Sequence, residues 1–177
     1  MNSFDELARE RFSVRKFTEE PVRPEDLKKI LDMAVVAPTG HNAQPHQIIV
    51  LQGDEGIEKL KKITRCDFGA KTALMVCYDR EACWQRKYDG YRCGETDAAI
   101  VTTHMMLEAW DIGVASCYVH FFRPEAAREE LHLPENLVPA DMLMLGYAAP
   151  DAEPAPLHSE TKALDELVSY NDYGSRA

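Results

Sequence analysis

Two cationic side chains and a hydroxyl alternate near the amino-terminal end of the chain, in the segment Arg-Phe-Ser-Val-Arg. In an extended segment, side chains at every second position point to the same side. Arg11, Ser13 and Arg15 would then form one polar row, and guanidinium groups bind phosphate through paired hydrogen bonds. The row therefore predicts a receptor for a phosphate. A solvated basic surface on an acidic protein is the alternative that this pattern leaves open.

A second polar cluster lies in the segment Pro-Thr-Gly-His-Asn-Ala-Gln-Pro, residues 38–45, between an apolar helical pattern and an apolar strand pattern. Proline and glycine fix the path of such a loop. Asn42 and Gln44 carry amides that both donate and accept hydrogen bonds, and such a pair can recognise the edge of a heterocycle. The alternative is a turn whose amides bind the loop's own backbone.

Residues 80–96 mix aromatic side chains, both charges and glycine, and follow neither a helical nor a strand period. We expect a loop or a short helical excursion there. Trp84, Tyr88 and Tyr91 can stack on an aromatic ligand. Packing within a long surface loop is the alternative.

Alternating helices and strands must position these three segments. Ser3 and Glu6 form a capping box that opens a first helix. Pro24 suits the first residue of a second helix, and Pro38 and Gly40 stop it. Strands are expected at residues 48–51, 73–78, 114–119 and 141–148, and further helices at residues 55–63, 124–131 and 163–168.

The most apolar helix is expected from Asp97 to Ile112, with Asp97 as its N-cap and Gly113 as its stop. Because it is apolar nearly all round, it is typical of a buried helix. The alternation of elements favours one α/β or α+β layered domain that spans residues 1–177.

Composition narrows the function classes. The 177 residues are 45% hydrophobic and 28% charged, which is typical of a globular domain and excludes a disordered chain. A net charge of -10 argues against nucleic acid or an anionic membrane as the main partner. The five cysteines include no Cys-x-x-Cys pair, which favours free thiols and no metal site. With no secretory signal and no membrane-spanning run, we expect a cytoplasmic protein.

The order of the motifs is more specific than any one of them. Arg-x-Ser-x-Arg-x-Phe is followed by a helix and by Ala-Pro-Thr-Gly-x-Asn-x-Gln-Pro before a strand. Asp-Ala-Ala-Ile then opens the long apolar helix, and Gly-Val-Ala-Ser-Cys-Tyr-Val follows it. The whole chain resembles the nitroreductase superfamily of FMN-dependent oxidoreductases. The resemblance implies an α+β fold with three layers, α/β/α, around a central mixed sheet, in an intertwined homodimer with FMN at the subunit interface.

The resemblance also implies roles for particular residues. Arg11 and Ser13 would hold the FMN phosphate, and Lys162 would complete that site. Relatives often carry a basic pair there, and Thr161 stands here where the second cation is expected. Arg15 would lie nearer the pyrimidine edge, where its charge stabilises the negative charge that reduction places on the flavin.

Further flavin contacts are implied for the partner subunit and for the segment that ends the 114–119 strand. The partner would contribute Pro38, Thr39, Gly40 and Asn42, and Gln44 is also expected to bind the cofactor. Residues 118–121, with His120 and Phe121, would pass the flavin N5 and O4 edge with backbone groups. The sequence departs from the family pattern at His120, where many relatives carry glycine, and at His46, where tryptophan is usual.

The implied reaction passes two electrons from NADH or NADPH through the flavin to a small aromatic acceptor, such as a nitro compound or a quinone, in a ping-pong cycle. The missing Gly-x-Gly-x-x-Gly motif is consistent with a dinucleotide that visits the flavin only briefly. Positioning and electrostatics suffice for such a transfer, so the resemblance requires no catalytic acid or base from the protein. The alternatives are other flavin chemistry on the same fold, namely reductive dehalogenation or substrate oxidation, and a flavin-binding protein without turnover.

Overall fold

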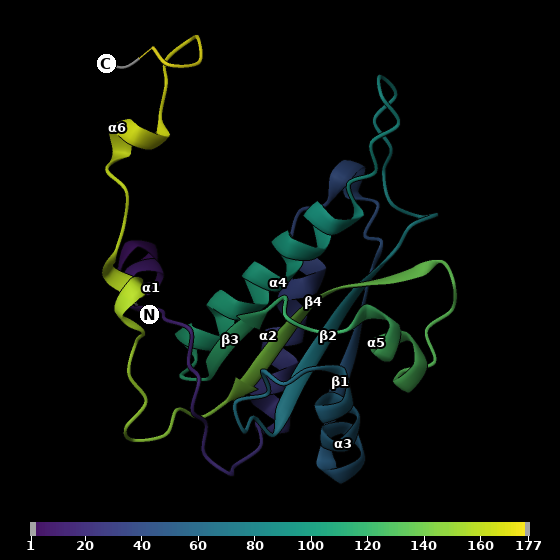
Figure 1. Ribbon diagram of the computed structural model, residues 1–177, viewed down its shortest axis with the longest axis vertical. Helices are drawn as coiled ribbons and strands as arrows, with labels where there is room; N and C mark the ends of the chain where they lie inside the picture. Colours follow the sequence, from purple (N-terminus) through teal and green to yellow (C-terminus); the bar gives the residue numbers. More distant parts are fainter. Residues whose placement is uncertain (1–2, 176–177) are drawn as a thin grey trace.

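The computed structural model describes residues 3–175, and its four strands form one sheet in the order β1-β2-β4-β3 (Figure 1). The strands are β1 (His46–Gln52), β2 (Thr72–Asp79), β3 (Ala115–Val119) and β4 (Leu137–Gly146). Each pair of neighbours is antiparallel. The expected α+β class is confirmed, while the pairing among the described residues is antiparallel throughout instead of mixed.

The direction of β2 has a simple geometric cause. Gln52, which ends β1, pairs with Thr72, which begins β2. Helix α3 (Gly53–Ile63) therefore carries the chain away from this end of the sheet, and residues 64–71 bring it back. A parallel pair would need the connection to finish at the opposite end of the sheet, and a strand–helix–strand order in the sequence does not distinguish the two.

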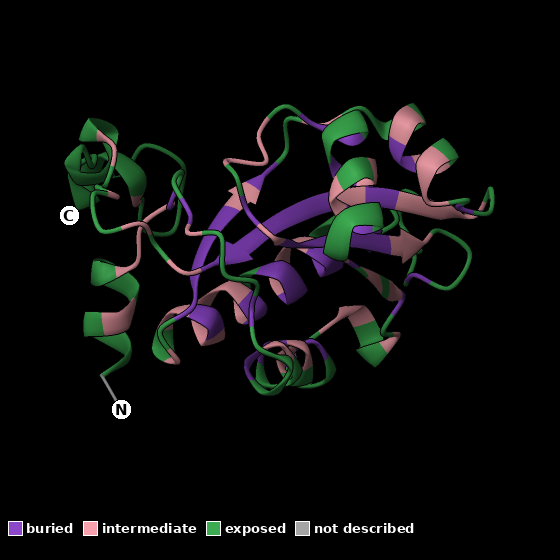
Figure 2. Cartoon of the chain, turned by 90° about the horizontal axis from the view of Figure 1, so that it is seen from below, coloured by how far each residue is buried: buried purple, intermediate pink, exposed green. Residues whose placement is uncertain are grey.

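Helices cover both faces of the sheet, which gives the expected three layers. The remaining helices are α1 (Phe4–Glu10), α2 (Pro24–Val36), α4 (Gly94–Asp111), α5 (Pro124–Glu130) and α6 (Leu164–Leu167), with 3-10 turns η1 (Gly40–Asn42) and η2 (Pro156–Ser159). One core, with Ile30, Val101 and Met105, lies between the sheet and α2 with α4. The other, with Leu60 and Ile63, lies between the sheet and α3 with α5. Figure 2 shows burial concentrated in the sheet and on the inner sides of these helices.

Strand β4 begins earlier than its apolar run predicts. Cys77 pairs with Pro139 and Val76 pairs with Asp141, so Ala140 is an extra residue in a bulge. A proline cannot donate to a strand ladder and is tolerated beside a bulge. This local irregularity lets the strand extend back through Pro139 to Leu137.

Helix α4 also begins earlier than expected. Its N-cap is Cys93, so the prediction of Asp97 as N-cap is wrong. A Cβ on Gly94 would lie 2.1 Å from Cδ2 of Tyr78, so only glycine allows the helix to start against that ring. The predicted stop at Gly113 is confirmed in position, because this residue follows the helix with a φ of 80°.

The carboxy-terminal segment leaves the body of the molecule after β4. Its turn η2 lies beside α1, and α6 stands away from the sheet (Figure 1). Large apolar side chains on this segment are exposed, with Leu157 and Leu164 each at 73% and Leu167 at 65%. We call residues 150–175 the C-terminal arm. Among the described residues no helix combines the length and the apolar character that crossing a bilayer requires.

Candidate functional site

The Arg-x-Ser-x-Arg segment is extended and anchored along the sheet, as its spacing predicts. The backbone N–H of Val14 donates to the carbonyl of Ser116 in β3 at 2.9 Å, and that of Thr18 donates to Tyr147 at 2.8 Å. Val14 is fully buried, whereas Arg15 is exposed. Since side chains alternate along an extended segment, Ser13 and Arg15 lie on the side opposite Val14.

The positive charge of this segment is not neutralised by the chain itself. Within residues 3–175, every ion pair involves other cations, and the Arg11 and Arg15 guanidinium groups join none. Arg15 Nη1 donates only to the Ser13 carbonyl, at 3.4 Å. Beneath them, burial raises the pKa of the Cys117 thiol, and the charges of Arg15 and Arg11 oppose that shift. The arrangement is suited to an anion.

The loop of residues 38–45 is strained. His41, Asn42 and Gln44 have φ values of 55°, 53° and 45°, in the left-handed region that non-glycine residues seldom adopt. Such strain persists only where the surroundings hold it, and it often occurs at ligand sites. The loop is fastened at two points: Thr39 Oγ1 accepts from the Gln44 N–H at 3.0 Å, and Gln44 Nε2 donates to Val35 O at 3.3 Å. The side-chain nitrogen of Gln44 thus ties the loop to the last turn of α2.

A third fastening comes from a residue to which the sequence assigned only a capping role. Asp97, 3% exposed, accepts from the Gly40 N–H at 2.8 Å through Oδ1 and from the Cys93 thiol at 3.0 Å through Oδ2. It therefore holds the loop against the first turn of α4. Because Asp97 follows Glu95 and Thr96 in the sequence, nothing there marked it as a buried carboxylate that needs partners.

The two predicted cofactor-binding segments lie at opposite ends of α4. Phe12 packs edge-on against Trp110 near the last turn, with ring centroids 5.3 Å apart, whereas Gly40 contacts Asp97 in the first turn. At 1.5 Å per residue, Asp97 and Trp110 are about 20 Å apart along the helix. A single chain therefore does not bring the two segments together, which is the geometry expected if a second subunit supplies the loop.

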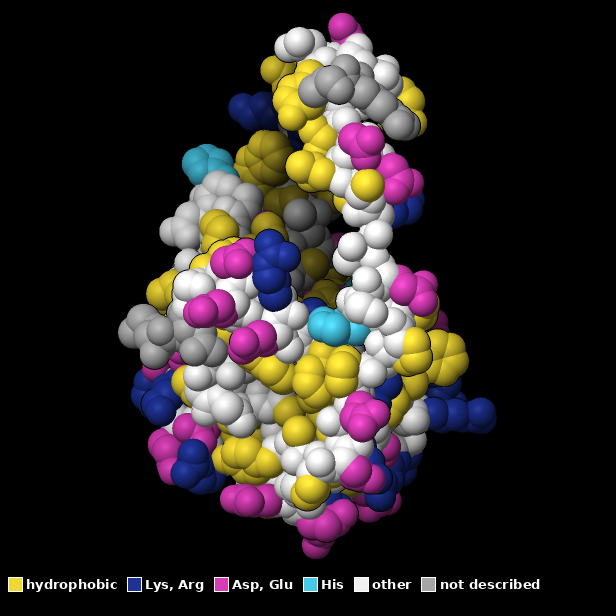
Figure 3. Space-filling model, turned by 90° about the vertical axis from the view of Figure 1, so that its left-hand side faces the viewer, with side chains coloured by type: hydrophobic (Ala, Val, Ile, Leu, Met, Phe, Trp, Pro, Cys, Tyr) yellow, Lys and Arg dark blue, Asp and Glu magenta, His cyan; other side chains and the backbone are white. Residues whose placement is uncertain are grey.

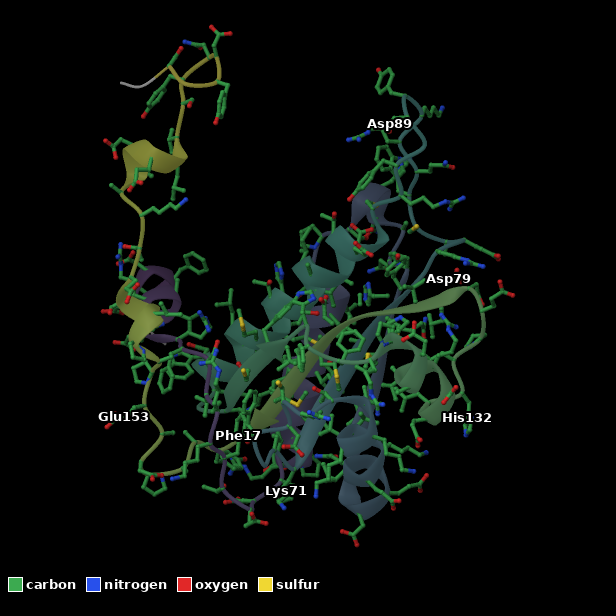
Figure 4. All side chains as sticks on the ribbon, in the orientation of Figure 1. Phe17, Lys71, Asp79, Asp89, His132 and Glu153 are labelled. Carbon is green, nitrogen blue, oxygen red and sulfur yellow. The ribbon has the colours of Figure 1, made fainter. Side chains whose placement is uncertain are left out.

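The aromatic residues of the 80–96 excursion lie at the same end of α4 as the loop. The strand-like bridge between Gln85 and Arg92 makes the excursion a narrow projection, with Asp89 near its tip (Figure 4). Tyr88 is 97% exposed, while the Tyr91 hydroxyl lies 2.8 Å from Thr96 Oγ1. Trp84 borders Gly40, since a Cβ built on that glycine would lie 3.3 Å from the Trp84 Cβ.

His120 and Phe121 follow the last residue of β3, as expected. The Phe121 carbonyl accepts from Thr64 Oγ1 at 2.5 Å, which fixes the backbone there. His120 Nε2 lies 3.3 Å from Oδ1 of Asp141, a β4 residue that is only 2% exposed. Burial raises the pKa of Asp141, and hydrogen bonding from Tyr118 and the charge of His120 oppose that shift. Sequence reasoning missed Asp141, which sits inside an apolar run.

Lys162 belongs to the C-terminal arm and is exposed. The arm approaches the amino-terminal segment where His158 meets Phe12, with ring centroids 6.2 Å apart. Figure 3, which views the molecule from this side, shows the arm projecting beyond the body with apolar side chains along it. Lys162 is thus four residues beyond the point at which the arm passes the residue next to Arg11.

Comparisons with known proteins agree on one family. The model of the nitroreductase family matches residues 8–74 and 67–147. A protein of Archaeoglobus fulgidus whose name includes NAD(P)H nitroreductase is 32% identical over 146 residues, covering 77% of this chain and 80% of that protein. A Bacillus subtilis FMN reductase [NAD(P)H] is 26% identical, covering 89% and 74%. A crystal structure of a nitroreductase family protein from Clostridium difficile superposes with a TM-score of 0.90 at 43% identity, covering 97% and 99%.

Proposed function

This chain belongs to the nitroreductase family, and from that premise we propose that it is an FMN-dependent oxidoreductase. It takes two electrons from NADH or NADPH and passes them to a small aromatic acceptor, such as a nitro compound or a quinone. Similar proteins named as an FMN reductase [NAD(P)H] and as NADPH-dependent oxidoreductases support this reaction class. Nothing in the chain's own residues favours dehalogenation or substrate oxidation over it.

The donor set around β3 fits the phosphate of FMN. Arg11 and Arg15 are free of carboxylates among the described residues, and Ser13 adds a hydroxyl in the same row. The buried hydroxyl of Ser116, on the strand residue that anchors Val14, has no partner in the described part of the chain. A bound dianion would satisfy the guanidinium groups. This uncompensated cationic row is the observation that carries the function.

When bound, FMN supplies reversible hydride transfer, which is the hard chemistry of the reaction. The chain's residues then have positioning roles. Arg11 and Ser13 hold the phosphate, with Lys162 as a further cation from the arm. Arg15 would place positive charge near the flavin ring and so stabilise the negative charge that reduction adds. Residues 118–121 would line one edge of the ring, and the hydrogen bond from Thr64 to Phe121 holds their backbone.

A homodimer completes the site. Because α4 separates the row at Arg11 from the loop at Gly40 by about 20 Å, we place the partner's loop, with Pro38, Thr39 and Asn42, over the flavin of this chain. The exposed leucines of the C-terminal arm need cover, and a second copy provides it without exposing a new apolar surface. Trp84, Tyr88 and Tyr91, on the same end as the loop, are then available to an aromatic acceptor.

The test is made on the purified protein under anaerobic conditions. The protein carries a flavin absorbance, NADH or NADPH bleaches it, and a nitroaromatic or a quinone restores it. A protein that binds no flavin overturns the function, and one whose flavin is never bleached is a flavin-binding protein without turnover. Light scattering is expected to give twice the chain mass of 20.0 kDa, and a stable flavin-loaded monomer contradicts the shared site.

A further inference from the structure

A buried carboxylate holds an exposed histidine at the carboxyl end of β3. Asp141 is 2% exposed, and its Oδ1 lies 3.3 Å from His120 Nε2, whereas the side chain of His120 is 67% exposed. Oδ2 of Asp141 lies 3.3 Å from Thr102 Oγ1 in α4. A carboxylate at this depth costs stability unless it is paired. Three polar side chains therefore converge on this buried acid: Thr102 of α4, Tyr118 of β3, and His120 directly after β3.

The contact with Asp141 determines which ring nitrogen of His120 carries the proton. A neutral imidazole carries one N–H, and a carboxylate acceptor at Nε2 places that proton on Nε2. Nδ1 is then left to accept a proton, and the protonated ring donates it again from Nδ1. The Tyr118 ring supports this orientation, because it packs against the His120 ring with centroids 4.9 Å apart and an angle of 40°.

His120 lines a cavity of about 480 Å³ that also has Asp141, Glu95 and Thr96 in its wall. The apolar part of the wall comes from Phe122, Pro124, Pro139, Ala99 and Ala140. Cavities of this size accommodate small organic ligands. The acidic groups in its wall are Glu95 from α4 and Asp141 from β4, and the Tyr118 hydroxyl of β3 contacts Asp141. An acidic wall suits a neutral aromatic molecule better than an anion.

We propose that this cavity takes the oxidising substrate and that His120 donates a proton to it. The inference rests on the function proposed above. Reducing a quinone to a hydroquinone consumes one hydride and one proton. With FMN bound, the cofactor would supply the hydride that turns the quinone into the hydroquinone monoanion. The oxygen of that monoanion would then form an O–H bond as the Nδ1–H bond of His120 breaks. The imidazole is left neutral and regains its proton from water. Asp141 is a positioning residue, because it acts through His120.

The decisive experiment compares two oxidants on the flavin-loaded protein after anaerobic reduction with NADH or NADPH. A quinone needs a proton, whereas ferricyanide takes electrons alone. His120→Gln keeps a side-chain N–H for Asp141 but has no proton to give. We expect quinone-dependent reoxidation to slow by about 100-fold relative to reoxidation of the same variant by ferricyanide. The readout is therefore the ratio of the quinone rate to the ferricyanide rate in each protein.

His104→Gln is the matched control. His104 lies on α4, its Nδ1 is 2.8 Å from the Ile100 carbonyl, and it is outside the cavity wall. Both oxidants are expected to act on this variant as on the wild type. Equal slowing of both oxidants in His120→Gln would show a structural role for His120, and an unchanged quinone rate would also overturn the inference. A protein that binds no flavin, or is not reduced, refutes the proposed function instead.

A measurement that needs no turnover tests the positioning role of Asp141. Long-range ¹H–¹⁵N spectra report which ring nitrogen of a neutral histidine carries the proton. We expect the Nε2–H form for His120 in the wild type and a mixture of both forms in Asp141→Asn. The Nδ1–H form in the wild type, or an unchanged Nε2–H preference in Asp141→Asn, would contradict the assigned contact.

Discussion

The structure leaves no space for a side chain at Gly40, so we expect Gly40→Ala to lower the free energy of unfolding. A Cβ built on Gly40 would lie 2.6 Å from Cys93 Sγ and 3.3 Å from the Trp84 Cβ. Ordinary carbon contacts are about 3.5–4.0 Å, so the thiol would have to move by about 1 Å. Cys93 is 8% exposed, and Sγ is held by Asp97 Oδ2 at 3.0 Å. It cannot move without losing that contact.

The expected cost of Gly40→Ala follows from these contacts. Overpacking a filled site lowers the free energy of unfolding by about 1–3 kcal/mol. Replacing glycine by alanine raises it by about 0.4–1 kcal/mol, because alanine restricts the unfolded chain. The net loss is about 1–2 kcal/mol. In a Cys93→Ala background the obstructing sulfur is gone, so Gly40→Ala should then cost less than about 0.5 kcal/mol. In Cys83→Ala, where a nearby buried thiol is removed instead, the full cost should remain.

Urea unfolding followed by circular dichroism measures these free energies. The protomer and cofactor concentrations must be equal for all variants, because a ligand or a partner subunit raises the apparent stability. The double-mutant cycle between Gly40 and Cys93 is expected to give a coupling of about 1 kcal/mol or more. An equal cost of Gly40→Ala in the wild-type and Cys93→Ala backgrounds would refute the argument that the thiol fills the space above this glycine.

Four further predictions follow from other parts of the structure. Arg11→Ala should weaken FMN binding by about 1.5–3 kcal/mol in fluorescence titrations, and unchanged affinity contradicts its phosphate role. Lys162→Ala should weaken it less, and the loss should shrink at high salt, because an exposed charge is screened over about 8 Å. A hydrogen bond from Arg23 lowers the pKa of Asp26 in the folded protein. The ionised carboxylate therefore stabilises the fold above the unfolded-state pKa of about 3.9, and this contribution is lost as the pH falls through the lower folded-state pKa. Asp26→Asn should lower the urea midpoint at pH 7 and leave it unchanged at pH 2. Burial raises the pKa of Cys77 to about 12, so iodoacetamide at pH 8 should leave it unmodified in mass spectra until the protein unfolds.

Local signals in the sequence located most elements because each acts within one turn of helix or one strand. The capping box at Ser3 and Glu6 is present, with the Glu6 carboxylate 2.8 Å from the Ser3 N–H. Pro24 is the first residue of α2, as its fixed φ and missing N–H favour. The apolar run at residues 73–78 lies within β2, whose first six residues are all buried.

Features of the fold that depend on residues far away in the sequence could not be predicted from local patterns. The antiparallel direction of β2 depends on how far residues 64–71 return the chain, and the bulge at Ala140 depends on the register against β2. Asp97 is not the N-cap of α4, and one of its two partners, Gly40, is 57 residues away in the sequence. The positive φ values of His41 and Gln44 likewise reflect the fastening of the loop, since neither residue type is required to adopt them.

In the candidate site, too, residues placed by local spacing were predictable, and residues placed by distant partners were not. The row of Arg11, Ser13 and Arg15 was predictable because an extended period of two places these side chains together. Asp97 and Asp141 were not predicted, although both are at most 3% exposed, and only Asp141 lies in an apolar run of the sequence. Each buried carboxylate is retained at a cost and holds one exposed segment: Asp97 holds the loop at Gly40, and Asp141 holds His120. In this fold the buried acids therefore support the candidate site, and the exposed segments that they hold would contact the ligand.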